Sequence, residues 1–464
     1  MSKANYERSA RWKAKDSPVP IHKYAFAPDF VFGASTSAYQ IEGGVGEETG
    51  RGASIWERYF ETRPHLDHGA VACDHYNRME EDVRMMKSMN LKAYRFSISW
   101  SRVLPLGKGK VNEQGLEFYS RLVDELLRNG IEPYVTLYHW DLPQALEDEG
   151  GWLNRDTAYA FADFAALIAH RLGDRVKYFG TLNEPEVIVA GYIGDGLAPG
   201  LSDPNLRVKV AHNLMLAHGL ATQALRSINP DFKIGVTLNL VPAEAKDAAN
   251  PASVNAARRH WLKNYAIYLE AIFKARYPDV VLEEMAATGA VIHPGDMAII
   301  SQRIDYLGVN WYLRHVVDEN GGIIDMPGAQ KTLMGWEIHA PALTRMLVSM
   351  NEEYRLPPIF ITENGAALDD TFAKGRVRDV GRMAYIHDHL SALESAVAAG
   401  VNVAGYFAWS LMDNLEWSLG FKMTFGIVHV DRNTLVRTIK DSGLWFRDMI
   451  KFNVRGSRKS GKRR

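Results

Sequence analysis

The sequence predicts a single α/β domain in which eight parallel strands close into a (β/α)8 TIM barrel. Short runs rich in β-branched and aromatic residues recur eight times, and a segment of helical period follows each run. Alternating strands and helices allow either an open doubly wound sheet or a closed barrel, and the count of eight favours closure. No linker rich in glycine, serine or proline divides the 464 residues. Because a barrel needs only about 250 residues, we expect elaborated loops after the strands.

The eight runs supply the predicted strands in chain order, since each is short, apolar and rich in residues that favour strands. They are residues 30–34, 93–99, 133–138, 178–182, 233–238, 306–311, 358–362 and 403–409. Two intervening helices are defined by apolar residues spaced three and four apart, which gives each helix one face toward a sheet. In residues 113–128 that stripe is Leu116, Tyr119, Leu122, Val123, Leu126 and Leu127, and in residues 379–399 it is Val380, Met383, Ala384, Leu390, Leu393 and Val397. Residues 240–251 and 316–335 are expected to be long irregular loops.

Basic residues concentrate at both ends of the chain. We therefore expect residues 1–25 to form a basic N-terminal extension, residues 26–452 the barrel, and residues 453–464 a basic, solvated C-terminal tail.

Composition excludes several classes of partner. Lys and Arg total 54 against 55 Asp and Glu, so a net charge of −1 gives no global attraction to a nucleic-acid backbone. No run of about 18 uninterrupted apolar residues is present, so no membrane partner is expected. Cys73 is the only cysteine and cannot form an intrachain disulfide, which favours a reducing compartment and a cytoplasmic location. The sequence leaves the oligomeric state open, with a homo-oligomer as one alternative.

Polar and aromatic residues with ligand-binding chemistry follow the predicted strands at their ends. The carboxyl ends of barrel strands meet at one mouth, where active sites are built, so these side chains should converge. They are Gln40 after the first run, His139 and Trp140 after the third, Asn183 and Glu184 after the fourth, Asn310 and Tyr312 at the sixth, Glu363 at the seventh, Trp409 at the eighth, and Glu416 and Trp417 in the loop beyond.

Two of these segments each place a glutamate at a strand end. Residues 181–185 (TLNEP) and 361–365 (ITENG) contribute Glu184 and Glu363. Each segment also has a structural interpretation, because Asn183 could cap a helix that starts at Pro185 and Asn-Gly favours a turn. Two carboxyl groups that face one mouth suit glycosidic-bond cleavage, in which one protonates the leaving oxygen while the other attacks the anomeric carbon or activates water.

Competing chemistries lack their motifs. There is no His-Glu-x-x-His and no pair of cysteines, so no metal site is expected. The glycines near residue 44 lead into Glu47 and Glu48, which would repel phosphate, and no Gly-x-Ser-x-Gly elbow is present. Cys73 is better interpreted as a buried structural residue than as a nucleophile.

The chain resembles the family-one β-glycosidases, the β-glucosidase group of retaining glycoside hydrolases. The resemblance covers about residues 30–445 and rests on ordered motifs at residues 32–43 (FGASTSAYQIEG), 73–76 (CDHY), 94–100 (YRFSISW), 138–143 (YHWDLP), 183–185 (NEP), 362–365 (TENG) and 409–417 (WSLMDNLEW). It implies an eight-fold β/α barrel, no cofactor, and a small-molecule β-glycoside or short oligosaccharide as substrate.

The resemblance also assigns roles to residues. It makes Glu184 the general acid/base and Glu363 the nucleophile, with the two carboxyl groups about 5–5.5 Å apart. It assigns the non-reducing-end sugar to Gln40, His139, Asn183, Trp409, Glu416 and Trp417, with Phe425 closing that pocket. Arg95 and Tyr312 keep Glu363 ionised and oriented, Asn310 lies close to them, and Trp336 is the platform for the leaving group.

The expected function is hydrolysis of terminal, non-reducing β-D-glucosyl residues by double displacement, with β-galactosides or β-fucosides also accepted. An alternative within the same fold is a β-galactosidase or transglycosylase. An alternative from another class is a sugar-binding protein without turnover, although both glutamates are intact in this sequence.

Overall fold

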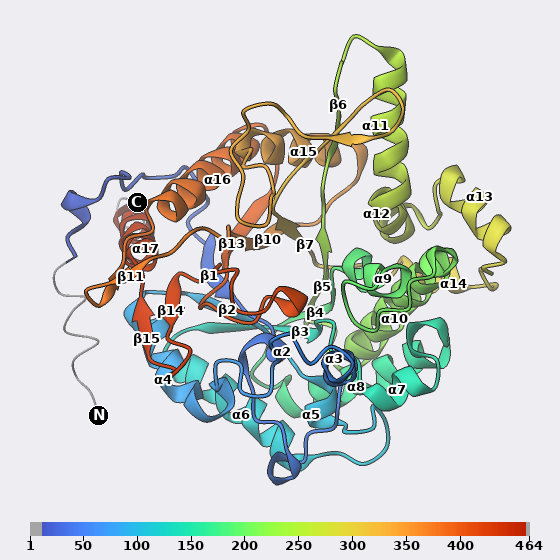
Figure 1. The fold of residues 1–464 in the computed structure, drawn as a ribbon, viewed down its shortest axis with the longest axis horizontal. Helices are drawn as coiled ribbons and strands as arrows, with labels where there is room; N and C mark the ends of the chain where they lie inside the picture. Colours follow the sequence, from blue (N-terminus) through green and yellow to red (C-terminus); the bar gives the residue numbers. More distant parts are fainter. Residues whose placement is uncertain (1–11, 461–464) are drawn as a thin grey trace.

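The computed structural model describes residues 12–460, and its centre is a closed barrel of eight parallel strands (Figure 1). Around the barrel the strands follow the order β1-β13-β10-β7-β5-β4-β3-β2, so each strand pairs with its neighbours along the chain, and the last pairs with the first. The strands are β1 (Val31–Ser35), β2 (Ala93–Ser97), β3 (Glu132–Tyr138), β4 (Tyr178–Asn183), β5 (Lys233–Asn239), β7 (Tyr306–Trp311), β10 (Ile359–Asn364) and β13 (Val403–Trp409). The predicted TIM barrel is confirmed, and all eight predicted runs match barrel strands.

Helices surround the barrel and follow its strands. The longer ones are α4 (His75–Ser88), α6 (Glu113–Arg128), α8 (Asp156–Leu172), α10 (Arg207–Ile228), α11 (Pro251–Asn264), α15 (Ala340–Glu353), α16 (Val380–Ala398) and α17 (Asp441–Ser460). Shorter ones are α2 (Ala38–Ile41), α3 (Ile55–Glu61), α5 (Trp100–Val103), α7 (Gln144–Asp148), α9 (Pro185–Ile193), α12 (Ala266–Lys274), α13 (Asp279–Thr288) and α14 (Asp296–Ile300).

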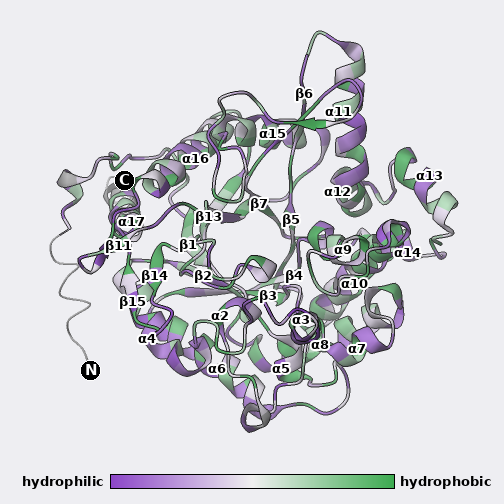
Figure 2. Cartoon of the chain, in the orientation of Figure 1, coloured by the Kyte–Doolittle hydropathy of each residue, from purple (hydrophilic) through white to green (hydrophobic). Residues whose placement is uncertain are grey.

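Helix α6 has the bounds that its apolar spacing predicts. Leu116, Leu122 and Leu126 of the predicted stripe are buried, whereas Leu127 is exposed because it lies past the edge of the buried face. In Figure 2 the ribbons of α6 and α8 alternate between hydrophilic and hydrophobic residues, as expected for helices with one buried face.

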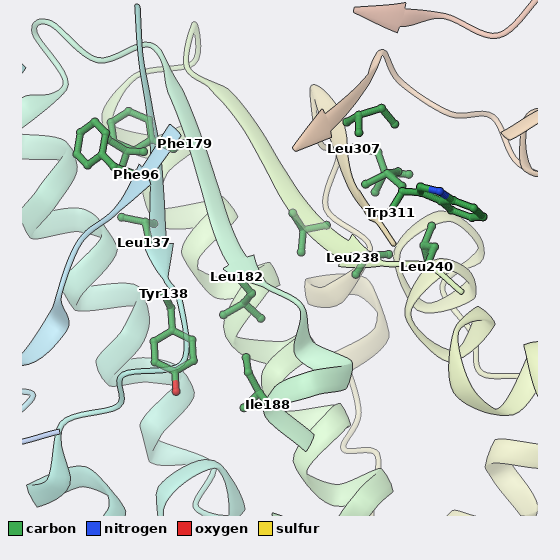
Figure 3. Packing of buried hydrophobic residues seen from close by; sticks show 14 of the residues in the cluster. Phe96, Leu137, Tyr138, Phe179, Leu182, Ile188, Leu238, Leu240, Leu307 and Trp311 are labelled. Atoms are coloured by element: carbon green, nitrogen blue, oxygen red, sulfur yellow. The ribbon is translucent and has the colours of Figure 1, made fainter. Parts of the chain in front are cut away.

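Strand side chains alternate between the inside of the barrel and the layer under the helices. In β10, Phe360 belongs to an interior cluster with Tyr134, Tyr306 and Phe407, while Ile359 and Ile361 belong to the large outer core. Figure 3 shows side chains of that outer core, including Leu137 of β3 and Leu182 of β4. The aromatic cluster fills the barrel interior and leaves the carboxyl ends of the strands free for polar residues.

The two stretches predicted to be irregular loops contain short strands, so that expectation was wrong. β6 (Ala243–Ala245), β8 (His315–Val317) and β9 (Ile323–Ile324) form a small sheet, and β6 and α11 project from the barrel rim in Figure 1. Their backbone groups are satisfied by pairing between loops that are distant in sequence, which local patterns do not reveal. Two further hairpins pair β11 (Phe372–Ala373) with β12 (Arg376–Val377), and β14 (Val428–Val430) with β15 (Arg437–Ile439).

The described ends of the chain pack against the barrel domain. The Trp445 indole N–H of α17 donates to Val19 O (3.2 Å), and the Trp12 indole N–H donates to Asp448 Oδ2 (3.0 Å). Helix α17 continues to Ser460. The predicted domain boundaries at residues 25 and 453 therefore fall within segments that the structure joins to the domain, and they stay a prediction.

No helix within residues 12–460 has the combination of length and apolar composition that crossing a membrane requires. In the same part of the chain, no group of three or more His, Cys, Asp or Glu side chains is arranged to hold a metal ion.

The close approach of two strand ends yields a test of the fold. A Cβ added to Gly365, immediately after β10, would lie 1.7 Å from the carbonyl oxygen of Trp409 at the end of β13. Gly365→Ala should lower the free energy of unfolding by about 3 kcal/mol, measured by urea denaturation, because backbone must move to relieve the clash. Gly196→Ala is the control, since its Cβ would meet nothing within 4 Å. Equal stability of the two variants would contradict this packing.

Candidate active site

Glu184 and Glu363 both lie at the mouth of the barrel. Glu363 is the penultimate residue of β10, and Glu184 directly follows β4 as the residue before α9. Both residues are buried, each 3% exposed. Glu184 has a left-handed backbone (φ 52°) and its N–H donates to Thr237 O (2.9 Å), which turns the chain abruptly between strand and helix.

The Glu363 carboxylate accepts two hydrogen bonds from buried donors. Arg95 Nη1 donates to Oε1 and Tyr312 Oη donates to Oε2, both at 2.7 Å. Burial raises the pKa of Glu363 above its ordinary range, and the positive charge of Arg95 and the bond from Tyr312 counteract that rise. These contacts favour the ionised form of Glu363 over that of any nearby carboxyl that lacks them.

Glu184 has a different environment, without a cation bonded to it. Asn310 Nδ2 donates to Glu184 Oε1 (2.5 Å), and Asn239 Nδ2 lies 3.5 Å from Oε2. Burial first, then the charges of Glu363 and Glu186, hold the pKa of Glu184 well above its ordinary range. The direct bonds from Arg95 and Tyr312 therefore favour ionisation of Glu363 over ionisation of Glu184.

A continuous series of side chains connects the two glutamates. Arg95, which bonds Glu363, also donates through Nη2 to Asn183 Oδ1 (2.5 Å). Asn310, which bonds Glu184, donates to the same Asn183 oxygen (3.1 Å). Asn183 therefore does not cap α9, as one interpretation of its sequence allowed, because its side-chain oxygen accepts from Arg95 and Asn310 instead.

His139 faces the same network from the end of β3. The Asn183 amide lies 3.1 Å from His139 Nε2, and a bond donated by that amide places the ring proton on Nδ1. Burial and then the charge of Arg95 hold the pKa of His139 well below its ordinary value, so the ring is neutral. Within the described residues Nδ1 has no hydrogen-bond partner although it is buried, which leaves a donor for a ligand.

Aromatic rings line one side of the mouth. Trp409, at the end of β13, stacks on His139 with ring centroids 5.8 Å apart, and Trp417 also stacks on His139, with ring centroids 6.1 Å apart. The ring centroid of Trp417 lies 4.8 Å from that of Trp140 and 4.5 Å from that of Trp56. Flat apolar surfaces beside hydrogen-bonding groups suit the two kinds of face that a pyranose ring presents.

A second aromatic group surrounds Tyr312, which bonds Glu363. Tyr312 contacts Trp336 (5.1 Å between centroids) and Phe425 (6.1 Å); Tyr312 and Phe425 form a buried cluster with Trp409, and the partly buried Trp336 packs against it. Trp336 comes from the long loop after β7, and Phe425 from the loop after β13.

Gln40 and Glu416 complete the predicted set. The Gln40 amide donates to Asn414 Oδ1 (3.1 Å) and Leu415 O (2.7 Å), and its carbonyl oxygen accepts from Ser37 Oγ (2.6 Å). Gln40 thus holds the loop of Glu416 and keeps acceptor capacity for a ligand hydroxyl. Burial and then the charge of Glu363 raise the pKa of Glu416 to about 8.

The predicted site residues therefore come together at one mouth and are joined directly or through shared neighbours; most lie at strand ends or in loops, while Arg95 lies in the middle of β2 and Gln40 within α2. Sequence reasoning missed Asn239 and Glu186. The predicted fifth strand stopped at residue 238, one residue before Asn239, and Glu186 resembled an ordinary acidic residue in the first turn of a helix. The backbone N–H of Asn239 donates to Glu186, and burial raises the pKa of Glu186 to about 8.

Comparisons with known proteins agree with this geometry. The model of glycosyl hydrolase family 1 matches residues 22–455. β-Glucosidase A of Thermotoga maritima is 42% identical over 445 residues, which cover 92% of this chain and 98% of that protein. A bifunctional β-D-glucosidase/β-D-fucosidase of Bifidobacterium breve is 40% identical, covering 92% and 98% of the two chains.

Solved structures show the same likeness. A psychrophilic β-glucosidase from Micrococcus antarcticus superposes with a TM-score of 0.89 at 41% identity, covering 93% of this chain and 98% of that one. A β-glucosidase from Thermotoga maritima in complex with deoxynojirimycin superposes with a TM-score of 0.88 at 41% identity, covering 93% and 99%.

The raised pKa of Glu416 predicts a pH-dependent cost to stability. The folded state binds this proton more tightly than the unfolded chain, so wild-type stability falls as pH rises from 4.5 through about 8. Glu416→Gln cannot ionise, and it should unfold with a free energy on the order of 2 kcal/mol higher than wild type at pH 9, with little difference at pH 4. Urea denaturation at both pH values measures this.

The exposed carboxyl Glu352 supplies the control, because Glu352→Gln should change stability by less than about 0.5 kcal/mol at either pH. A gain for Glu416→Gln that is the same at pH 4 and pH 9 would contradict the pKa assigned to Glu416.

Proposed function

The chain belongs to glycosyl hydrolase family 1, and from that premise we propose that it cleaves β-glucosides with Glu184 as acid/base and Glu363 as nucleophile. Retaining hydrolysis of β-glucosides is the activity of this family member, and the roles of individual residues are our proposal. One observation supports the assignment above others: Arg95 and Tyr312 both bond Glu363, whereas Glu184 bonds neutral amides.

In the first step the Glu363 carboxylate attacks the anomeric carbon as the bond from that carbon to the leaving oxygen breaks. Glu184 transfers its proton to the leaving oxygen, so the aglycone departs as a neutral alcohol. The products are a glycosyl ester on Glu363 and an ionised Glu184. Esterification removes the negative charge that raised the pKa of Glu184, which makes the ionised form easier to hold.

In the second step a water molecule occupies the place of the aglycone. Glu184 takes a proton from that water, the oxygen of the water bonds to the anomeric carbon, and the ester bond to Glu363 breaks. β-Glucose leaves with retained configuration, and both carboxyl groups return to their starting protonation states. The shared network of Arg95, Asn183 and Asn310 supports a short separation of the glutamates, for which we keep the expected value of about 5–5.5 Å.

For the non-reducing-end sugar we propose the set Gln40, His139, Asn183, Trp409, Glu416, Trp417 and Phe425. The free Nδ1–H of His139 and the remaining lone pair of Gln40 supply a donor and an acceptor, as sugar hydroxyls require. The Asn183 amide is held by Arg95 and Asn310 beside Glu184, where it can contact the 2-hydroxyl. Trp336 supplies a flat surface for the leaving group.

Glu416 bears on the choice among sugars. Its side chain would contact the 4- and 6-hydroxyls, and an ionised carboxylate there would repel a 6-phosphate. With its pKa raised to about 8, Glu416 is largely protonated near neutral pH in the empty site, so discrimination against a 6-phosphate should strengthen as pH rises. Galactosides and fucosides differ at these positions, and the Bifidobacterium relative named for both glucosidase and fucosidase activity supports acceptance of β-fucosides.

A panel of aryl β-glycosides tests the substrate proposal. We expect the highest kcat/KM for the glucoside or fucoside, a lower value for the galactoside, turnover of cellobiose, and none of the 6-phosphoglucoside. Turnover of the phosphoglucoside alone would contradict the role of Glu416. A high yield of transfer products with added acceptor sugar would favour the transglycosylase alternative. Loss of all turnover in Glu363→Ala, with sugar binding retained, would exclude a purely binding function.

Glu184→Gln tests the assignment of the acid. With cellobiose, whose leaving group needs a proton, kcat should fall by about 10³ or more, because general acid catalysis contributes about 10²–10⁴. With a 2,4-dinitrophenyl glucoside the first step should be nearly unaffected, and pre-steady-state release of the phenol measures it directly. Asp163→Asn, an exchange remote from the mouth on α8, is the control. Equal losses on both substrates would assign the acid to another group.

A cytoplasmic location and a homo-oligomeric state stay part of the proposal. The first is supported by the single buried cysteine, Cys73, which leaves no intrachain disulfide to maintain.

A further inference from the structure

We propose that Arg314 is a positioning residue for the leaving-group side of the site, because it fixes the hairpin that carries Trp336 against the loops after β5 and β7. The inference rests on the proposed function, in which Trp336 is the platform for the leaving group. Among the described hydrogen bonds, those of Arg314 go to Glu337 and Glu244 and none goes to Glu184 or Glu363.

Trp336 is presented by a short hairpin, residues 330–338. Its two arms are joined by hydrogen bonds from Ile338 N–H to Gln330 O (2.8 Å) and from Thr332 N–H to Trp336 O (2.9 Å). The Leu333 N–H donates to Ala367 O (2.9 Å), which ties the tip to the loop after β10. The position of Trp336 therefore follows the position of the hairpin as a unit.

Arg314 holds that hairpin through the residue next to Trp336. Its Nε and Nη2 donate to the two oxygens of Glu337 at 3.0 and 2.9 Å, a bidentate pair, and its Nη1 donates to Glu244 Oε2 at 2.5 Å. Arg345 of α15 donates to the other Glu244 oxygen at 2.6 Å. Two acidic and two basic side chains thus balance in charge.

The contact between Arg314 and Glu337 is more buried than an ordinary surface ion pair, and it is bidentate. The side chains of Arg314 and Glu337 are 12% and 14% exposed, so water screens their bidentate contact only in part. Burial raises the pKa of Glu244, and the bonds and charges of Arg345 and Arg314 more than offset it, so the net direction is downward. The lowered pKa of Glu244 therefore favours the charged form of the carboxylate that Arg314 and Arg345 share.

Arg314 joins three loops that reach the reacting groups. It lies two residues after Tyr312, which bonds Glu363. Glu244 lies in β6, which pairs with β8 and follows the strand that ends at Asn239, a neighbour of Glu184. Glu337 follows Trp336, whose ring contacts Tyr312. Loss of the guanidinium should release the hairpin while leaving the glucose-binding residues near Gln40 in place.

Arg314→Gln tests this proposal. KM for 4-nitrophenyl β-glucoside and for cellobiose should rise at least about fivefold with kcat within about twofold, since binding on the leaving-group side is lost. The inhibition constant of deoxynojirimycin, which resembles the sugar but carries no leaving group, should stay within about twofold. Arg314→Lys keeps the charge without the planar fork and should be intermediate. Arg258→Gln removes a bidentate pair with Glu353 elsewhere and is the matched control.

A double-mutant cycle shows whether Arg314 acts through Trp336. In the Trp336→Ala background, Arg314→Gln should cause no further rise in KM, because the platform is already gone. The inference would be overturned if the effects of the two substitutions on KM were additive. It would also be overturned if Arg314→Gln impaired KM, kcat and deoxynojirimycin binding to the same extent. If Trp336→Ala alone leaves KM unchanged for both substrates, the proposed role of Trp336 fails instead. Glu337→Gln breaks the same pair from the other side and carries the test if Arg314→Gln does not fold.

Discussion

The ion pair between Arg95 and Glu363 is the interaction on which the mouth of this barrel depends. Both side chains are 3% exposed, and a charge removed from water to that degree persists only when it is paired and hydrogen-bonded. Tyr312 donates a further hydrogen bond to Glu363, and the side-chain oxygen of Asn183 accepts a hydrogen bond from the other terminal nitrogen of the Arg95 guanidinium. This one arrangement sets the difference between the two glutamates, because the cation is bonded to Glu363 and only influences Glu184 from a distance.

The barrel makes such a contact between residues that are far apart in sequence. Arg95 and Glu363 are separated by 268 positions, and Asn310 and Glu184 by 126. Parallel strands that close on themselves bring every carboxyl end to one rim, so each strand contributes one or two side chains at a fixed place. Left-handed backbone at Glu184, Trp140 and Trp417 turns the chain sharply at that rim and directs these side chains into the mouth.

The periodic features of the sequence predicted the fold well. Strands such as residues 306–311 and the helix at residues 113–128 have their predicted bounds because alternation and helical spacing reflect which face is buried. The glutamates were found because each ends a clear strand. Asn239 was missed because its strand extends one residue past the apolar run, and the sheet of β6, β8 and β9 was missed because pairing between distant loops leaves no local period. Trp336 came only from the family resemblance, since its hairpin is held by ion pairs that the sequence does not place.

The most direct test of the account is to trap the intermediate on the nucleophile. A 2-deoxy-2-fluoro-β-glucoside with a good leaving group forms the glycosyl ester quickly and hydrolyses it slowly, because fluorine at C2 destabilises the oxocarbenium-like transition states. Peptide mass spectrometry of the inactivated protein should find one sugar per chain, on the peptide that contains Glu363, with none on Glu363→Gln. A sugar attached to Glu184 or to any other residue, or hydrolysis with inversion and no trapped ester, would contradict the account.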